Sequence, residues 1–391
     1  MKKFLFSSLL FAGLISSSAH AQVSFGTGDN NLEIGGVISA YLNYRPLKAE
    51  ETDRDKNKNR YKLRDARFYL EGHNSNKFEY KLQVDFANIG VTTVDPESPA
   101  LYDAWFMYKA FKPFYIKIGY QDIPYSRSSM TATTKSVYWQ RPEISRGELF
   151  SRHDVGITLQ KSLWNQRINA YLGMYTGTGE LFYQGDNDKS GAFEYVGRLD
   201  IAYPSRFRYQ DFDPKNTPVP MFAIGVNGRY TKRDLPAGQA FIDGESGTYG
   251  VKVVDGKKLT LGADAAFQYK GFNLQFETQQ VKGTPNSDKD VLLRGLPKEL
   301  TDGYFKSGGW YGQLSYYVMP LKTILSARYE EFDINDLEAG NSKRFGGAIA
   351  YILNGSRTMI KAQYFHIQKE DPMDPQTWKN QFRIGIQLAF E

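Results

Sequence analysis

The chain has 391 residues, no cysteine and a formal charge of +6 at pH 7. Charged residues make up 24% of it, and beyond the N-terminus it lacks the runs of about 20 apolar residues that helical membrane spans need. Disulfide bonds and cysteine-based metal sites are excluded. The 27 tyrosines, 26 phenylalanines and 36 glycines favour one large β-structure, because aromatic residues prefer strands and glycines serve turns and bulges.

Residues 1–21 have the pattern of a cleaved secretory signal. Lys2 and Lys3 precede a short apolar stretch, and residues 19–21 (Ala-His-Ala) have the small-x-small pattern of a cleavage site. A membrane anchor is the weaker alternative, because the apolar stretch is too short to span a bilayer. We therefore expect residues 22–391 to form a single exported domain.

From Leu32 onward, apolar and polar residues alternate along the chain. Between Lys77 and Phe86, for example, the apolar side chains share one face of a strand and the polar side chains share the other. Most such segments run about 9–13 residues, the length of a tilted strand that crosses a bilayer. Sixteen segments of this kind start near Leu32, Tyr61, Lys77, Leu101, Pro113, Arg152, Gln166, Phe193, Pro220, Lys258, Gly271, Gly308, Lys322, Ser342, Arg357 and Asn380.

The connections between these segments alternate between tight turns, such as Lys270-Gly271, and long loops, such as residues 122–151. This asymmetry is typical of outer-membrane barrels, in which closure satisfies every backbone polar group inside the hydrocarbon. The sequence thus predicts an all-β fold, a transmembrane antiparallel β-barrel of about 16 strands. Short turns should face the periplasm together with both chain ends, and long loops should face outward. Residues 205–219 are long where a short turn is expected, and the pattern gives them no role.

A barrel of this size has consequences for function. About eight strands close around a packed interior, whereas sixteen leave an aqueous channel. Residues 122–151 form the longest loop, the third, and we expect it to fold inward and narrow the channel. The sequence therefore predicts a porin for passive diffusion, with no catalysis and no cofactor. The alternatives are a non-selective or cation-preferring porin, and a structural or adhesive barrel.

Basic residues gather on the third loop and on the last four strands. Charged side chains on a pore wall select ions, and the guanidinium fork suits phosphate and carboxylate. The candidate solute contacts are Arg127, Lys135, Arg141, Arg146, Arg152, Arg328, Arg344, Lys361 and Arg383. Charges on the other wet faces, which include Lys81, Lys109 and Lys117, nearly cancel. In the alternative interpretation, all these charges are merely solvated or paired across strands.

Two motifs are weighed and set aside. Ser151-Arg152-His153-Asp154 contains the residue types of a hydrolase triad, but neighbouring side chains of a strand point to opposite faces. Residues 186–191 resemble the start of a calcium loop, but Gly197 stands where the twelfth-position Glu is required. We expect no catalytic or metal site. Because the chain is exported and its charge is dispersed, we expect no nucleic-acid partner.

Five short motifs lie between residues 60 and 160. They are residues 64–72 (RDARFYLEG), 78–87 (FEYKLQVDFA), 102–105 (YDAW), 116–119 (IKIG) and 124–126 (PYS). In these motifs the chain resembles the phosphate-selective porin O and P family of Gram-negative outer membranes. The resemblance implies a sixteen-stranded barrel in outer-membrane lipid, usually a homotrimer, that passes small anions such as phosphate. Family members commonly carry a basic residue where Asp122 stands, and an acidic one where Arg127-Ser128 stand.

Overall fold

A computed structural model describes most of the chain. It covers residues 23–26, 30–45, 59–75, 77–88, 100–111, 114–146, 149–177, 179, 190–234, 254–286, 292–293, 296–297, 299–333, 335–337, 341–355, 357–369 and 380–390. The expected signal, residues 1–21, and most of the set-aside calcium motif lie outside the described residues.

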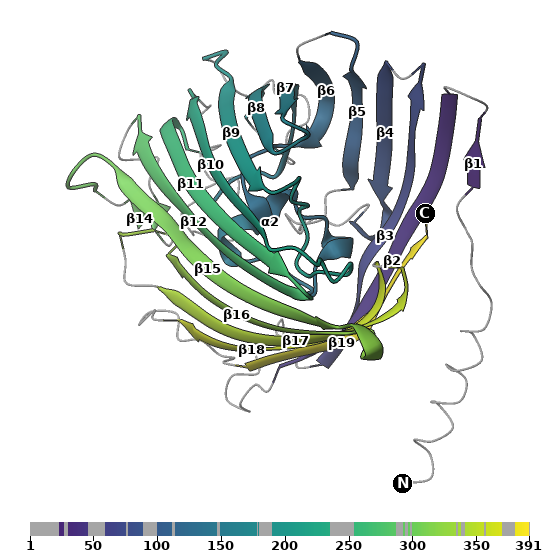
Figure 1. Ribbon diagram of the computed structural model, residues 1–391. Helices are drawn as coiled ribbons and strands as arrows, with labels where there is room; N and C mark the ends of the chain where they lie inside the picture. Colours follow the sequence, from purple (N-terminus) through teal and green to yellow (C-terminus); the bar gives the residue numbers. More distant parts are fainter. Residues whose placement is uncertain are drawn as a thin grey trace.

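Sixteen of the described strands form one closed antiparallel barrel (Figure 1). Each barrel strand pairs with the next along the chain, and the last pairs with the first, which closes the sheet. The sixteen predicted segments are confirmed, and each of the sixteen barrel strands starts within three residues of its predicted start. The strands are β2 (Asn30–Tyr44), β3 (Asn59–Asn74), β4 (Phe78–Asp85), β5 (Leu101–Tyr108), β6 (Tyr115–Asp122), β7 (His153–Leu163), β8 (Ile168–Tyr175), β9 (Glu194–Tyr203), β10 (Met221–Lys232), β11 (Gly256–Tyr269), β12 (Phe272–Pro285), β15 (Phe305–Val318), β16 (Thr323–Asp333), β17 (Ser342–Asn354), β18 (Thr358–Lys369) and β19 (Asn380–Phe390).

Some short elements were not predicted. The strand β1 (Val23–Phe25) pairs with the beginning of β2. A two-stranded hairpin, β13 (Leu292–Leu293) with β14 (Leu296–Pro297), lies in the connection between β12 and β15. The short helices are α2 (Arg127–Met130) and the 3-10 helices η2 (Phe86–Asn88), η3 (Thr133–Lys135), η4 (Glu143–Ser145) and η7 (Met319–Leu321). Within the described ranges, no helix has the length and apolar character to cross a membrane.

The tight turns form because their residues accept a left-handed backbone. Between β11 and β12, both Lys270 and Gly271 have positive φ, at 43° and 86°. Two such residues make the mirror-image turn whose twist matches that of paired strands. The first residue of β2 pairs with Asn74, and Phe390 at the end of β19 pairs with Gly36. Both described ends of the barrel therefore lie at its short-turn end, as the even strand number predicts.

The two faces of the barrel differ in chemistry. Along β12, Leu274 is 48% exposed on the outside, whereas its neighbour Gln275 is 1% exposed on the inside. An apolar outer face suits lipid, because the strand backbone is fully paired and only side chains meet the hydrocarbon. The inner face is polar but buried over much of its area. Chain segments therefore fill part of the interior, and Figure 1 shows α2 within the ring of strands.

Candidate functional site: a channel narrowed from both ends

The third loop lies inside the barrel, where its first half is fastened to β11 and β12. Ser126 caps α2, since its Oγ accepts a hydrogen bond from Ser129 N at 3.1 Å. Arg127 Nε donates to Asp264 Oδ1 of β11 at 2.7 Å. Ser128 N donates to Glu277 Oε2 of β12 at 3.0 Å. These contacts hold the short helix against the wall and leave Arg127 only 2% exposed.

The second half of the loop continues to the last strands of the barrel. Trp139 N donates to Gln363 Oε1 of β18 at 2.7 Å. Glu143 N donates to Glu330 Oε2 of β16 at 2.7 Å. In addition, Gln387 Nε2 of β19 donates to Thr134 O at 3.1 Å. The loop thus lines the inner wall from β11 round to β19, which is the inward fold that its length predicts.

The 205–219 connection enters the barrel from the short-turn end. Asp213 is its central residue, because its carboxylate accepts from Thr217 N at 2.6 Å, Gln268 Nε2 at 2.6 Å and Gly271 N at 3.0 Å. Phe212 is buried in one apolar cluster with Tyr138 of the third loop. Sequence reasoning gave this segment no role. The available signal was its aromatic content, since aromatic residues in a connection indicate burial.

The basic residues predicted on the last strands lie behind the third loop. Arg328 Nη2 donates to Gln140 O at 3.0 Å, and Lys361 Nζ donates to Ser136 O at 3.1 Å. Arg344 forms an ion pair with the Glu143 carboxylate. All three therefore hold loop residues in place. Arg383 is buried nearby, and its Nε donates to Asn43 Oδ1 at 2.9 Å.

The basic residues of the third loop itself divide by exposure. Arg141 is buried and donates to Ser128 O at 3.1 Å and Thr131 O at 2.8 Å. Arg152 is buried and its Nη2 lies 3.2 Å from Asp122 Oδ1. Lys135 and Arg146 are partly exposed, although Arg146 also pairs with Glu143 at 3.1 Å. Among the basic candidates of the loop, Lys135 and Arg146 are therefore the partly exposed ones.

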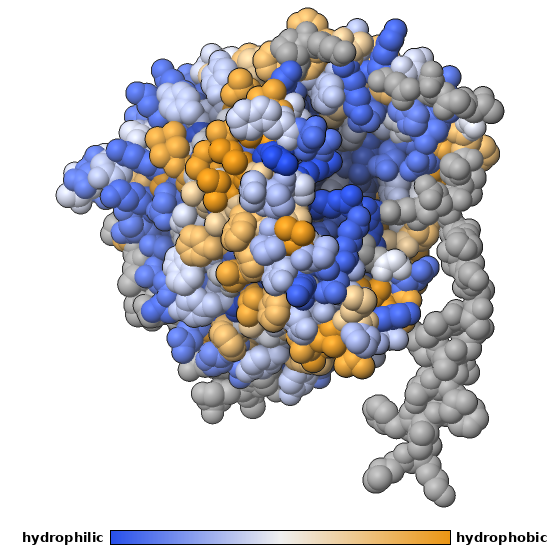
Figure 2. All heavy atoms as spheres, viewed as in Figure 1, coloured by the Kyte–Doolittle hydropathy of each residue, from blue (hydrophilic) through white to orange (hydrophobic). Residues whose placement is uncertain are grey.

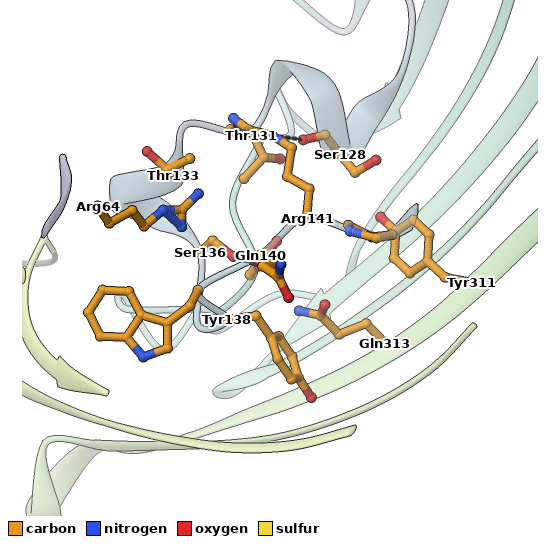
Figure 3. Close-up of a pocket in the computed structure, with 13 residues that line it drawn as sticks. Arg64, Ser128, Thr131, Thr133, Ser136, Tyr138, Gln140, Arg141, Tyr311 and Gln313 are labelled. Atoms are coloured by element: carbon orange, nitrogen blue, oxygen red, sulfur yellow. Dashed lines mark hydrogen bonds between the residues drawn. The ribbon is translucent and has the colours of Figure 1, made fainter. Parts of the chain in front are cut away.

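The space between the third loop and β15 is closed to solutes. Figure 3 shows Arg64, Arg141 and Gln313 around this space, with Arg141 reaching back along the loop. The enclosed volume is about 10 Å³. That is close to the room that one water molecule occupies. A solute route on this side is therefore blocked by packing.

The opposite wall, made by β4 to β8, is open. Toward the short turns, inward-facing side chains of this wall are partly exposed, including Lys81 at 23% and Lys109 at 29% of the side chain, whereas Asp85 and Gln121 near the long loops are buried. Figure 2 shows a hollow lined by hydrophilic residues on the side where Figure 1 places β4 to β6. A cavity of about 250 Å³ lies at the short-turn end of this wall, bounded across the lumen by Arg127 and Tyr209. The open part of the lumen that these observations show therefore lies along the short-turn half of β4 to β8, beside the two inward segments.

Three lysines, from β4, β6 and the end of β5, line the open wall. Lys81 Nζ lies 3.4 Å from Asp103 Oδ2 and 3.7 Å from Glu71 Oε2. Lys117 Nζ lies over the Trp105 ring at 4.3 Å, and Lys109 pairs with a glutamate on β4. The alternation of the sequence placed these lysines on the wet faces. It did not mark them as site residues, because which wall stays open depends on where the loop packs.

Two loop groups have shifted pKa values. Burial lowers the pKa of Lys135, and the positive charges of Arg357 and Arg208 lower it further. Burial acts to raise the pKa of Glu143, but the Arg344 and Arg146 guanidinium groups outweigh it and leave the pKa below its ordinary value. Glu143 is therefore an anchoring carboxylate. Lys135 is a lysine that loses its charge more readily than a free one.

Asp103, Asp122 and His153 offer potential metal ligands within 4.8 Å of one another. Their carboxylates already have cationic partners, since Lys81 lies 3.4 Å from Asp103 and Arg152 lies 3.2 Å from Asp122. We assign them no metal. His153 Nε2 is 2.9 Å from Asp122, whereas the Asp154 carboxylate bonds Thr176. The adjacent residues His153 and Asp154 thus have different partners, as the strand geometry predicts.

Comparison with known proteins identifies this architecture. The family described as phosphate-selective porin O and P matches residues 41–390. No curated protein matches the chain. An anion-selective porin from Comamonas acidovorans is similar in structure, with a TM-score of 0.55 and 12% identity over 92% of this chain and 100% of that one.

Two further solved structures are similar at comparable levels. The trimer form of OmpT, an outer membrane protein of Vibrio cholerae, has a TM-score of 0.57 and 11% identity over 93% of this chain and 100% of its own. The outer membrane channel DcaP of Acinetobacter baumannii has a TM-score of 0.55 and 13% identity over 94% of this chain and 100% of its own. At these identities the likeness shows the porin barrel fold.

Proposed function

Because the chain belongs to the phosphate-selective porin O and P family, we propose that its channel passes small anions, phosphate among them, by passive diffusion. Family and fold indicate a porin channel of the Gram-negative outer membrane. The observation that carries the anion preference is the series of partly exposed lysines, Lys81, Lys109 and Lys117, on the open wall.

The geometry of these lysines suits weak contacts that a passing anion makes with one lysine after another. Each ammonium group replaces part of the hydration of an anion, and conduction requires that the binding be weak enough for the anion to leave. Lys81 shares its charge with two carboxylates, which moderates its attraction for a solute. Lys117 is held over an aromatic ring and is partly exposed.

The nine basic candidates then take two roles. Lys135 and Arg146 contact solutes at the loop surface. Arg127, Arg141, Arg152, Arg328, Arg344 and Lys361 hold the loop in position, and together with the buried Arg383 they contribute positive potential from behind it. Buried ion pairs and charged hydrogen bonds can hold the loop in position, because moving the loop away would leave an uncompensated buried charge, which is unfavourable.

The remaining expectations are part of the same proposal. Residues 1–21 are removed on export, and the mature chain from Gln22 onward assembles as a homotrimer in outer-membrane lipid. One structurally similar protein is described as a trimer form, which supports this assembly. N-terminal sequencing of the purified protein and its mass in detergent, measured by light scattering, test the two points.

Uptake into proteoliposomes tests the anion preference. Labelled phosphate, labelled potassium and a neutral sugar of similar size are offered to vesicles that contain the folded protein. The proposal predicts that phosphate enters fastest. Faster entry of potassium would instead indicate a cation-preferring or general porin, and no uptake by folded protein would indicate a structural or adhesive barrel.

A further inference from the structure

The cavity at the short-turn end has a lining that a simple passage for inorganic ions does not need. Its volume is about 250 Å³, near the lower end of the usual range for small-molecule sites. One side is the wall of β4 to β10, and the other is built by Arg127 of the third loop and by residues of the 205–219 connection. The connection therefore creates the cavity by folding inward.

Four aromatic rings contribute to the lining. Tyr115 and Tyr171 come from β6 and β8, and Phe207 and Tyr209 come from the 205–219 connection. The rings thus lie on both sides of the cavity. Inorganic phosphate gains nothing from an aromatic surface, whereas the apolar C–H face of a sugar or another ring packs on one.

Neutral hydrogen-bonding groups form a second part of the lining. Gln160, Ser162 and Asn169 stand together on β7 and β8, and Ser162 Oγ donates to Asn169 Oδ1 at 2.7 Å. Amide and hydroxyl groups both donate and accept hydrogen bonds, so they match the hydroxyl groups of a sugar.

The cations of the cavity differ in their partners. Arg127 is paired with Asp264 at 2.7 Å, and Lys109 is paired with Glu79. Arg206 is exposed and donates to the uncharged side chain of Gln166 at 2.6 Å. A guanidinium group with a neutral partner keeps its charge available for a phosphate or carboxylate, which it binds with two parallel hydrogen bonds.

We propose that this cavity is a subsite for an organic anion, a sugar ring that carries a phosphate or carboxylate group. Arg206 binds the anionic group, Tyr115 and Tyr171 pack against the ring, and Gln160 and Asn169 bond its hydroxyl groups. The inference rests on the proposed anion channel and deepens it, because it names a class of solute larger than inorganic phosphate. Binding in the cavity holds such a solute before it leaves at the short-turn end.

Current recordings on single channels in a planar bilayer test the proposal with three probes. Glucose 6-phosphate has both ring and charge, glucose has only the ring, and inorganic phosphate has only the charge. We expect glucose 6-phosphate to halve the KCl current at about one tenth of the phosphate concentration, since one aromatic contact contributes about a factor of ten. Glucose should leave the current unchanged over the same range.

Two variants and a matched control locate the effect. Tyr115→Ala should remove the advantage of glucose 6-phosphate over phosphate, and Arg206→Gln should weaken block by both anions. Arg208→Gln is the control, because Arg208 is exposed in the same connection but does not line the cavity. It should leave the blocking concentrations of both phosphate and glucose 6-phosphate unchanged.

The outcomes separate this inference from the proposed function. The reversal potential under a KCl gradient is read in the same bilayers. Anion preference with equal block by phosphate and glucose 6-phosphate would overturn the subsite and leave the anion channel standing. A channel without anion preference would contradict both. Equal effects of Arg206→Gln and Arg208→Gln would overturn the assignment of the anion-binding residue.

Discussion

The Ser136 hydroxyl lies 2.5 Å from Asp211 Oδ2 inside the barrel. This contact joins the third loop, which follows β6 at the long-loop end, to the 205–219 connection, which enters from the short-turn end. Asp211 N also donates to Lys135 O at 3.2 Å. Both segments are also fastened to β11, the loop through Asp264 and the connection through Gln268. The two bonds of Asp211 tie the segments directly to each other and so help to set how far the loop stands from the open wall.

Replacing Asp211 should loosen the channel without unfolding the barrel. Asp211→Ala removes a charged acceptor, and a hydrogen bond to a charged group contributes about 1.5–3 kcal/mol. We expect open-channel current noise to rise several-fold, with little change in thermal unfolding, since every strand pair remains. Asp302→Ala, at an exposed site before β15, is the control. Equally quiet current in both variants would contradict the role of the contact.

The position of the channel is testable by thiol modification, because the native chain has no cysteine. Gln160→Cys places a thiol on the open wall, and Gln313→Cys places one behind the third loop, where Gln313 is 3% exposed. A charged methanethiosulfonate reagent should reduce the current through the first variant within minutes and leave the second unchanged. Equal reactivity of both thiols would show that the route does not follow β4 to β8.

The charge of Lys135 should titrate at a lower pH than that of a free lysine. Its pKa is lowered by burial and then by the charges of Arg357, Arg208 and Arg206. A lysine with a lowered pKa loses its charge earlier as the pH rises, so anion preference should fall on the alkaline side before ordinary lysines titrate. Lys135→Arg keeps the positive charge, so the anion preference of this variant should stay constant over the pH range in which the wild type loses it. If the variant loses anion preference over the same pH range as the wild type, Lys135 is not the titrating group.

Glu143 should keep the third loop anchored in mildly acidic solution. Its pKa is lowered in the folded protein, where Arg344 and Arg146 outweigh burial. A lowered carboxyl pKa stabilises the fold above the ordinary value of about 4.3, and that stabilisation is lost as the pH falls through the lowered pKa. Current noise should therefore stay low at pH 5. In the Glu143→Gln variant the current noise should be high already at pH 7. Low current noise in this variant would contradict the role of Glu143 in holding the loop.

The barrel was predictable because strand alternation is a local property. Neighbouring residues of a strand point to opposite faces, so the alternation of polar and apolar residues along Lys77 to Phe86 marks both faces of one strand. The number of strands and their starting residues therefore follow from the sequence alone. The channel route was not predictable in the same way. Arg328 and Lys117 both lie on wet faces, yet one is buried under the third loop and the other faces the channel.

The missing information is long-range. Trp139 bonds Gln363, which is 224 residues away, and Asp211 bonds Ser136, which is 75 residues away. No local period encodes such contacts, because they depend on where two inward segments pack. The sequence therefore indicated which residues are basic and inward, but not which of them meet water.

The reversal potential under a KCl gradient tests the central claim most directly. Wild-type protein and a Lys81→Gln, Lys117→Gln double variant are compared in planar bilayers, with Lys257→Gln, an exposed residue at the far end of β11, as control. We predict a chloride-preferring potential for the wild type and the control, and a shift toward potassium in the double variant. A wild-type potential that favours potassium, or a double variant identical to the wild type, would contradict an anion channel lined by these lysines.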